Sequence, residues 1–387
     1  MSMPRLSATA AAIPPSLLLR LFERAAGYAG EVIPLHIGDT HLGPPPASRF
    51  DRLGLDDAPS CWLYKYGPAA GWAPLIERIA AKLAARNRLA IEPAGVQITA
   101  GATHALSCAV GAVCDPGDEL LLLAPHWPLV RGIAQARAVV PVEVPFTTPL
   151  RAGGDPTAIL EAAITPRTRA LYVSTPNNPD GVVLSAAELA AVVAVAVRHD
   201  LWILSDEVYE DYVYDGAHVS IGSLPGAAER TITVFSFSKG YAQAGLRVGY
   251  AAGPVGAIAA MRKLVNHTVY NVPHAVQRAA LAALDAGDGF LGEARARSQA
   301  ARDRAVAALA VACATPAGST YLFLDLRPFA AGDPDGLLER IAAAGVVLAP
   351  GRGFGAAFAG WARLCFTAVD EARLATGIAR INAILGG

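Results

Sequence analysis

The sequence is poor in cysteine, and the cysteines it has are not spaced for a metal site or a disulfide framework. The five residues are odd in number, scattered along the chain and free of C-x-x-C spacing. Zinc sites and stapled secreted domains depend on such spacing or on even numbers of cysteines. We therefore expect no metal site, and we expect free buried thiols in a reducing compartment. The cysteines are Cys61, Cys108, Cys114, Cys313 and Cys365.

Long apolar runs and an excess of charge of one sign are also missing. No uninterrupted apolar run reaches the length that spans a bilayer, and residues 1–25 contain no apolar core followed by a cleavage signal. The net charge is −1, from 32 basic and 33 acidic residues. The chain therefore has no electrostatic footprint for nucleic acid or an anionic membrane. We expect a cytoplasmic protein whose partners are small molecules.

Apolar residues dominate what is present. They make up 53% of the 387 residues, and charged residues only 17%, against roughly 25% charged in an ordinary soluble domain. Seven short apolar runs alternate with helix-like segments: VQIT, ELLLLA, AVVPVEV, ALYVS, LWILS, TITVFS and RVGYAAG. Such runs are typical of parallel strands buried on both faces. The pattern predicts an α/β fold with a mostly parallel seven-stranded sheet flanked by helices.

The pattern changes after about residue 275. Two helix-like stretches, 274–287 and 292–312, precede three shorter strand-like runs and a closing helix. This order predicts a smaller α+β domain built from the two chain ends. We expect an N-terminal arm and helix at 1–45 that belong to the small domain, a large domain at 46–275 and a small C-terminal domain at 276–387.

Ligands of open α/β sheets gather at the carboxyl ends of strands, so the residues that follow each predicted strand are candidates. After VQIT, Gly101, Ala102 and Thr103 open a helix whose free amides suit a phosphate, although Thr103 alone is equally typical of a helix cap. Trp127, after ELLLLA, can stack on a flat ring or fill the core. Asn178, after ALYVS, lies in a proline-flanked turn.

Charged residues follow two more strands. Asp206 comes directly after LWILS, and a buried carboxylate there needs a cation or a donor. TITVFS leads into Ser236, Ser238 and Lys239, with Arg247 nearby. An arginine, two hydroxyls and a helix N-terminus form a phosphate site, and a lysine beside it can form an imine with an aldehyde cofactor.

In order and approximate spacing, these motifs resemble the fold-type I, class I/II aminotransferase family, whose cofactor is pyridoxal 5′-phosphate. The resemblance extends over essentially the whole chain. It implies that Lys239 carries the internal aldimine and shuttles the proton between the substrate Cα and the cofactor C4′. It implies that Asp206 keeps the pyridine nitrogen protonated and that Trp127 stacks on the ring. Asn178 and Tyr209, which follows Asp206 on the helix side, are implied to hydrogen-bond the ring phenolate.

The same resemblance implies further contacts. Arg363, in RLCF, would bind the substrate α-carboxylate, with Asn178 and Gly38, in HIGD, also near the substrate. Tyr66, in YKYGPAAG, would reach the phosphate of a neighbouring subunit, so a homodimer is expected. The implied cofactor-binding set is Gly101, Ala102, Thr103, Trp127, Asn178, Asp206, Tyr209, Ser236, Ser238, Lys239, Arg247 and Tyr66.

The resemblance implies ping-pong transamination, in which an L-amino acid gives its amino group to a 2-oxo acid. The motif residues do not separate this outcome from β- or γ-elimination or from O₂-dependent oxidation or hydroxylation on the same fold. No second arginine is evident for a distal carboxylate, since Asn266 lies near the position where dicarboxylate-specific members carry one.

Two other motifs point to different chemistry and are set aside. SFSK fits the S-x-x-K pattern of penicillin-recognising hydrolases, but it follows a strand and has no SDN or KTG partner. GRGFGA fits a loose dinucleotide fingerprint, but no βα unit follows it.

Overall fold

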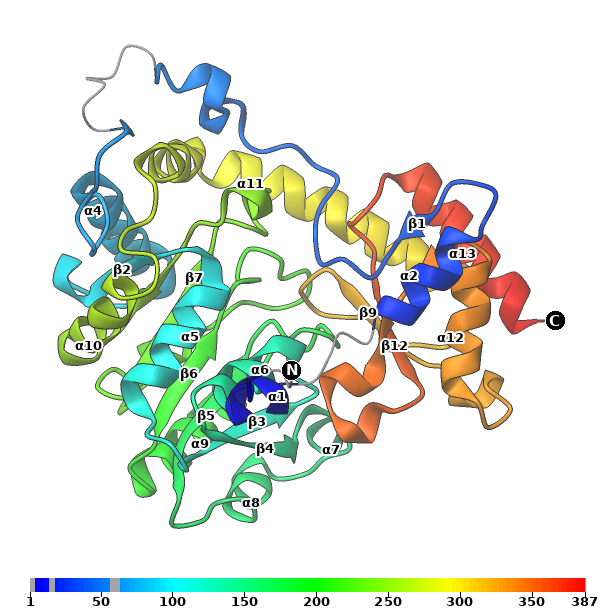
Figure 1. Ribbon diagram of the computed structural model, residues 1–387, viewed down its shortest axis with the longest axis horizontal. Helices are drawn as coiled ribbons and strands as arrows, with labels where there is room; N and C mark the ends of the chain where they lie inside the picture. Colours follow the sequence, from blue (N-terminus) through cyan, green and yellow to red (C-terminus); the bar gives the residue numbers. More distant parts are fainter. Residues whose placement is uncertain (1–3, 14–17, 56–62, 387) are drawn as a thin grey trace.

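A seven-stranded sheet forms the centre of the larger part of the molecule (Figure 1). The computed structural model describes residues 4–13, 18–55 and 63–386, so Cys61 lies outside the described residues. The strand order is β2-β8-β7-β6-β5-β3-β4, and neighbours are parallel except in the two pairs that include β8. The predicted mostly parallel seven-stranded sheet is confirmed. Its strands are β2 (Val96–Thr99), β3 (Glu119–Ala124), β4 (Val140–Pro145), β5 (Thr168–Ser174), β6 (Trp202–Asp206), β7 (Thr231–Ser236) and β8 (Gly249–Ala252).

Helices cover both faces of this sheet because its strands are apolar on both faces. Leu120 and Leu122 of β3 pack in one core with α5, α6 and α10, whereas Leu121 and Leu123 pack in another with α8 and α9. Alternate strand residues point to opposite faces, so a continuous apolar run needs cover on each. The helices around the sheet are α4 (Ala73–Lys82), α5 (Gly101–Val113), α6 (Pro128–Ala136), α7 (Thr147–Arg151), α8 (Pro156–Glu161), α9 (Ala186–Arg198) and α10 (Val255–Asn266).

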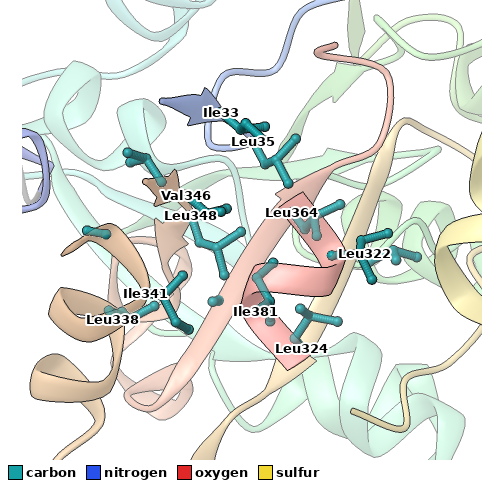
Figure 2. Packing of buried hydrophobic residues seen from close by; sticks show 14 of the residues in the cluster. Ile33, Leu35, Leu322, Leu324, Leu338, Ile341, Val346, Leu348, Leu364 and Ile381 are labelled. Carbon is teal, nitrogen blue, oxygen red and sulfur yellow. The ribbon is translucent and has the colours of Figure 1, made fainter. Parts of the chain in front are cut away.

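A smaller α+β unit is built from both ends of the described chain. Strand β1 pairs parallel to β10, and β9, β12 and β11 form an antiparallel sheet. Figure 2 shows Ile33 and Leu35 from the N-terminal part packed beside Val346, Leu364 and Ile381. These elements are β1 (Ile33–Pro34), α2 (Leu19–Ala26), β9 (Tyr321–Asp325), α12 (Pro334–Ala343), β10 (Val346–Val347), β11 (Ala349–Pro350), β12 (Trp361–Cys365) and α13 (Glu371–Leu385).

Two helices link the two parts. The short helix α1 (Ala8–Ala12) packs against α6 beside the large sheet (Figure 1). Helix α11 (His274–Ala308) corresponds to the two helices expected at 274–287 and 292–312, because its backbone leaves helical geometry at Gly287, whose φ is 67°, and two helical halves meet there at a kink. Its first half packs in the core with α4, and its second half packs in the core of the small unit. No helix among the described residues is both long and apolar enough to cross a membrane.

Candidate active site

A cavity of about 170 Å³ opens at the carboxyl ends of β2, β3, β5, β6 and β7. It is the edge at which an open α/β sheet binds ligands. Of the fourteen residues proposed from the sequence, twelve line this cavity, and Gly101 and Tyr66 do not. The lining residues are Gly38, Ala102, Thr103, Leu106, Trp127, Asn178, Asp206, Val208, Tyr209, Ser236, Ser238, Lys239, Arg247, Tyr321 and Arg363.

Lys239 lies just beyond the end of β7 and is half-buried. Its Nζ donates a hydrogen bond to the carbonyl oxygen of Gly38, in the N-terminal part of the chain, and lies 5.9 Å from the centroid of the Tyr209 ring. Tyr212 donates from its hydroxyl to the Lys239 carbonyl, at 3.2 Å, which fixes the backbone beneath the amine. The amine is thus held at the cavity by neutral partners.

Asp206 is the last residue of β6 and is only 5% exposed. Tyr172 of β5 donates from its hydroxyl to Oδ2, at 2.7 Å. Burial raises the pKa of Asp206 to about 6, although the Tyr172 hydroxyl, the Val208 amide and the charge of Lys239 act in the opposite direction. Ionised Asp206 therefore lacks full compensation, and a cationic group in the cavity would supply it.

A group of hydrogen-bond donors suited to an anion lies where α5 begins. Ala102 and Thr103 line the cavity in the first turn of this helix, whose amides have no partner inside the helix. Gly101 has a φ of 78°, and a Cβ there would lie 2.7 Å from Nη2 of Arg247, so the guanidinium packs directly over the helix start. Ser236 completes the group, with its Oγ accepting from the amide of Ser238 at 3.0 Å. Free amides, a guanidinium and hydroxyls suit a phosphate.

Arg363 projects from β12 and is 7% exposed. Its Nη1 donates to Oδ1 of Asn178 at 2.8 Å, and its Nη2 donates to the carbonyl of His36 at 2.6 Å. The guanidinium lies 4.1 Å from the ring centroid of Tyr321, and its buried Nε has no partner among the described residues. A buried guanidinium that is bound only to neutral groups is suited to an incoming carboxylate.

Two aromatic residues of the predicted set lie in turns. Tyr209 is in a turn after β6 and not at the start of a helix, so the expected helical position is wrong. Its hydroxyl pairs with that of Tyr321. Trp127 caps α6, half-buried, and its carbonyl is paired with Nδ1 of His126 at 2.9 Å. Both rings therefore face the cavity from short connections that are tied to neighbouring residues.

Tyr66 lies away from the cavity. Its side chain is 81% exposed, and its ring packs on the ring of Tyr270, with centroids 4.6 Å apart. Asn266 is exposed at the end of α10 and does not line the cavity. A single chain therefore leaves the tyrosine available at the surface, and no cavity contact is made by it within the described residues.

The sequence shows the family to which the chain belongs. The sequence model described as Aminotransferase class I and II matches residues 60–381. The chain belongs to this family. It is 38% identical to a probable aspartate/prephenate aminotransferase of Thermus aquaticus, over 79% of this chain and 80% of that one. It is 37% identical to the arginine–pyruvate transaminase of Pseudomonas aeruginosa, over 77% of each.

Solved structures agree with the family assignment. A mutant aspartate aminotransferase of Thermus thermophilus superposes with a TM-score of 0.90 at 33% identity, covering 99% of this chain and 100% of that chain. The chain is thus a pyridoxal-phosphate-dependent aminotransferase that acts on an amino acid and a 2-oxo acid. The relatives do not favour the alternative outcomes of elimination or oxidation.

The residues at the cavity fit pyridoxal phosphate. Its phosphate needs hydrogen-bond donors and positive charge, which the first turn of α5 and Arg247 offer. The absence of a side chain at Gly101 allows the Arg247 guanidinium to lie over this turn. Its ring nitrogen is a cation when protonated, which suits the buried carboxylate of Asp206. Its aldehyde needs a primary amine, and Lys239 is the lysine that lines the cavity.

Three lining residues were missed by sequence reasoning: Leu106, Val208 and Tyr321. Leu106 lies one turn into α5, and Val208 lies between two predicted residues, so each could have been inferred by extending a motif. Tyr321 begins an apolar strand, where no local signal distinguishes a cavity-facing ring from a core residue.

Proposed function

We propose that this cavity is the site of transamination and that the residues named from the sequence act there. The observation that carries the proposal is that Lys239, Asp206 and Arg363, which are far apart in the sequence, line one cavity. Each supplies a different requirement: an amine, a buried acid and a carboxylate receptor.

Cofactor binding is assigned to the floor of the cavity. We propose that Ala102, Thr103, Ser236 and Arg247 hold the phosphate and that Asp206 pairs with the ring nitrogen. Further contacts are proposed for Gly101, Trp127, Asn178, Tyr209 and Ser238. Pyridoxal phosphate, when bound, supplies an aldehyde that bonds to amines and a ring that withdraws electrons from the attached carbon.

Substrate binding is assigned to the side of the cavity next to the small unit. Arg363 would bind the α-carboxylate and orient the Cα–H bond, and Gly38 lies beside the place where the substrate would enter. The Nζ of Lys239, when neutral, removes the Cα proton as general base. Asn178 can accept from Arg363 and still donate from Nδ2 to a group in the cavity.

We also propose a homodimer in which Tyr66 reaches the phosphate of the partner's site. The proposal is supported by the exposure of two neighbouring aromatic side chains, Tyr64 at 86% and Tyr66 at 81%. Apolar side chains this exposed are more typical of an interface than of a free surface.

The domain division and the location remain proposals. The separate apolar cores support an N-terminal arm at 1–45, a large domain at 46–275 and a small domain at 276–387, with α11 crossing between the last two. A cytoplasmic location is supported by the free thiols of Cys108, Cys114, Cys313 and Cys365, since such thiols suit a reducing compartment.

Identification of the reactive lysine tests the proposal directly, because the chain has only four lysines: Lys65, Lys82, Lys239 and Lys263. Borohydride reduction of the protein with its cofactor, followed by peptide mass spectrometry, should place the added mass on Lys239. Lys239→Ala should lose the visible absorbance and all turnover, whereas Lys263→Ala, on the exposed side of α10, should keep both. Mass on another lysine, or a yellow and active Lys239→Ala variant, would contradict the assignment.

The substrate needs a separate experiment. The relatives are named for aspartate, prephenate and arginine, so no single donor follows from them. A panel of amino acids should be presented with 2-oxoglutarate or pyruvate, with and without oxygen, and the products identified by mass spectrometry. A new amino acid and a new 2-oxo acid in equal amounts are expected, whereas release of ammonia would indicate elimination or oxidation.

A further inference from the structure

Tyr321 lies between two residues to which roles have been proposed. It is the first residue of β9, is 1% exposed and lines the cavity. Its hydroxyl pairs with the hydroxyl of Tyr209, and its ring lies under Arg363. The same side chain therefore contacts the proposed cofactor ligand at one end and the proposed carboxylate receptor on its face.

The hydroxyl pair has a consequence for Tyr209. That residue is 2% exposed, so its hydroxyl cannot rely on solvent and needs a protein partner. The two rings meet edge to face, with centroids 5.5 Å apart and planes at 77°, which points the hydroxyls at each other. When Tyr321 donates, the proton of Tyr209 is free for an acceptor in the cavity. Two hydrogen bonds in series also strengthen each other.

The ring has a separate consequence for Arg363. The guanidinium carbon lies 4.1 Å from the Tyr321 centroid and 5.0 Å from that of Phe354. Cation–π contacts are strongest where water is excluded, as it is around this buried arginine. The Tyr321 ring packs on one face of the guanidinium, and Asn178 and the His36 carbonyl accept hydrogen bonds from its edge. The buried Nε has no partner among the described residues and remains available to a substrate carboxylate.

Tyr321 also restricts the loop that contacts Lys239. A Cβ on Gly38 would lie 2.0 Å from the Tyr321 hydroxyl oxygen, so only glycine fits beside this tyrosine. The carbonyl of Gly38 accepts the hydrogen bond from Nζ of Lys239. We propose that Tyr321 is a positioning residue that orients the Tyr209 hydroxyl, the Arg363 guanidinium and the Gly38 backbone together. This inference rests on the proposed function of the cavity.

Tyr321→Phe tests the hydroxyl while keeping the ring. In the protein with its cofactor, the pH midpoint of the visible absorbance of the lysine-bound cofactor should rise by roughly 0.3 pH unit, because Tyr209 then donates a weaker hydrogen bond. KM for the amino acid should change less than about twofold, because the ring under Arg363 remains. The other titratable groups around the pair, Lys239, Asp206, Arg363 and Cys365, are the same in both proteins.

Tyr321→Leu tests the ring, and Tyr214→Phe is the matched control for the hydroxyl variant Tyr321→Phe. The leucine variant should raise KM for amino acids by roughly fivefold to tenfold, with a smaller change in kcat, because Arg363 loses its support. Tyr214 likewise donates a partly buried hydrogen bond, to the Ser319 carbonyl at 2.6 Å, and lies under an arginine, Arg302, at 4.8 Å, but it does not line the cavity. Its phenylalanine variant should leave both the midpoint and KM unchanged.

The outcomes separate this inference from the function on which it rests. A Tyr321→Phe variant with the midpoint and kinetics of the unmodified protein would show that the hydroxyl has no such role, even if the leucine variant fails to fold. Equal shifts in Tyr321→Phe and Tyr214→Phe would likewise overturn it. If the unmodified protein binds pyridoxal phosphate without any lysine-linked absorbance, the proposed function itself fails.

Discussion

At the scale of single residues, the site depends on polar groups that are buried before any ligand arrives. Asp206 accepts from Tyr172, and Arg363 donates to Asn178 and to the His36 carbonyl. None of these partners neutralises the charge it contacts. Burying an uncompensated charge costs stability, so these groups destabilise the fold until charged groups of opposite sign bind to them.

This cost can be measured as a change of protein stability with pH, caused by the titration of Asp206. Its pKa is raised to about 6 in the folded protein, above an ordinary value of about 3.9 in the unfolded chain. The folded state therefore binds the proton more tightly, and stability falls as pH rises from about 4 to 6, by about 3 kcal/mol in total. In cofactor-free protein, Asp206→Asn should lack this loss, since an amide can still accept from Tyr172.

Chemical unfolding of both cofactor-free proteins between pH 4.5 and 7.5 measures the effect. The variant should gain stability relative to the unmodified protein as pH rises through 6. At pH 7.5, addition of pyridoxal phosphate should make the unmodified protein the more stable of the two. If the free energy of unfolding changed with pH in the same way in both proteins, Asp206 would not be the titrating group.

Individual site residues differ in how far the sequence could reveal them. Asp206 and Lys239 stand out because a charge directly after an apolar strand is costly unless it has a function. Tyr172 and Tyr321 could not be found in this way, because a tyrosine inside a strand looks like core until its partner is known. One of the two acceptors of Arg363 is the carbonyl of His36, which is distant in the sequence, so only the folded chain brings them together.

At the scale of elements, the carboxyl ends of the strands carry most of the site residues, and helix α11 connects the two units. The seven strands were predictable because each is a short apolar run bounded by turn residues. The break in α11 was predictable, because Gly287 and Gly289 interrupt its helix-like pattern, and the backbone does leave helical geometry at Gly287. The half before the break packs in the core with α4, and the half after it packs in the small unit.

The bend in α11 predicts opposite effects at its two glycines. Gly287 has φ 67° and ψ −159°, a conformation almost confined to glycine, so Gly287→Ala should destabilise the protein by about 1–3 kcal/mol. Gly289 does not have a positive φ, and a Cβ there meets nothing within 4 Å. Gly289→Ala should therefore stabilise by up to about 1 kcal/mol. The thermal unfolding midpoints of the two variants distinguish the sites, and equal shifts of the midpoint would mean that α11 has no bend at Gly287.

At the scale of the whole molecule, the large and the small unit both contribute residues to one cavity. The small unit contributes Arg363 and Tyr321, and the large sheet contributes Lys239 and Asp206. The chain ends fold into the same small unit through the pairing of β1 with β10, so a residue near the start, Gly38, can reach a site built mainly from the middle of the chain. Predicting this required knowledge of the fold, because local patterns do not show which ends meet.

The proposed homodimer can be tested by combining two different defective subunits in one dimer. If Tyr66 binds the phosphate in the partner's site, Tyr66→Ala should weaken cofactor binding about tenfold or more, the usual effect of removing a hydrogen bond to a charged group. A hybrid of a Tyr66→Ala subunit with a Lys239→Ala subunit should then contain one complete site, with Lys239 from one chain and Tyr66 from the other. Co-expressed with different tags and purified as the hybrid, it should show the cofactor affinity of the unmodified protein at half of its sites. Tyr64→Ala, at an equally exposed neighbour, should leave the affinity unchanged. A hybrid without any high-affinity site would mean that Tyr66 does not cross between subunits.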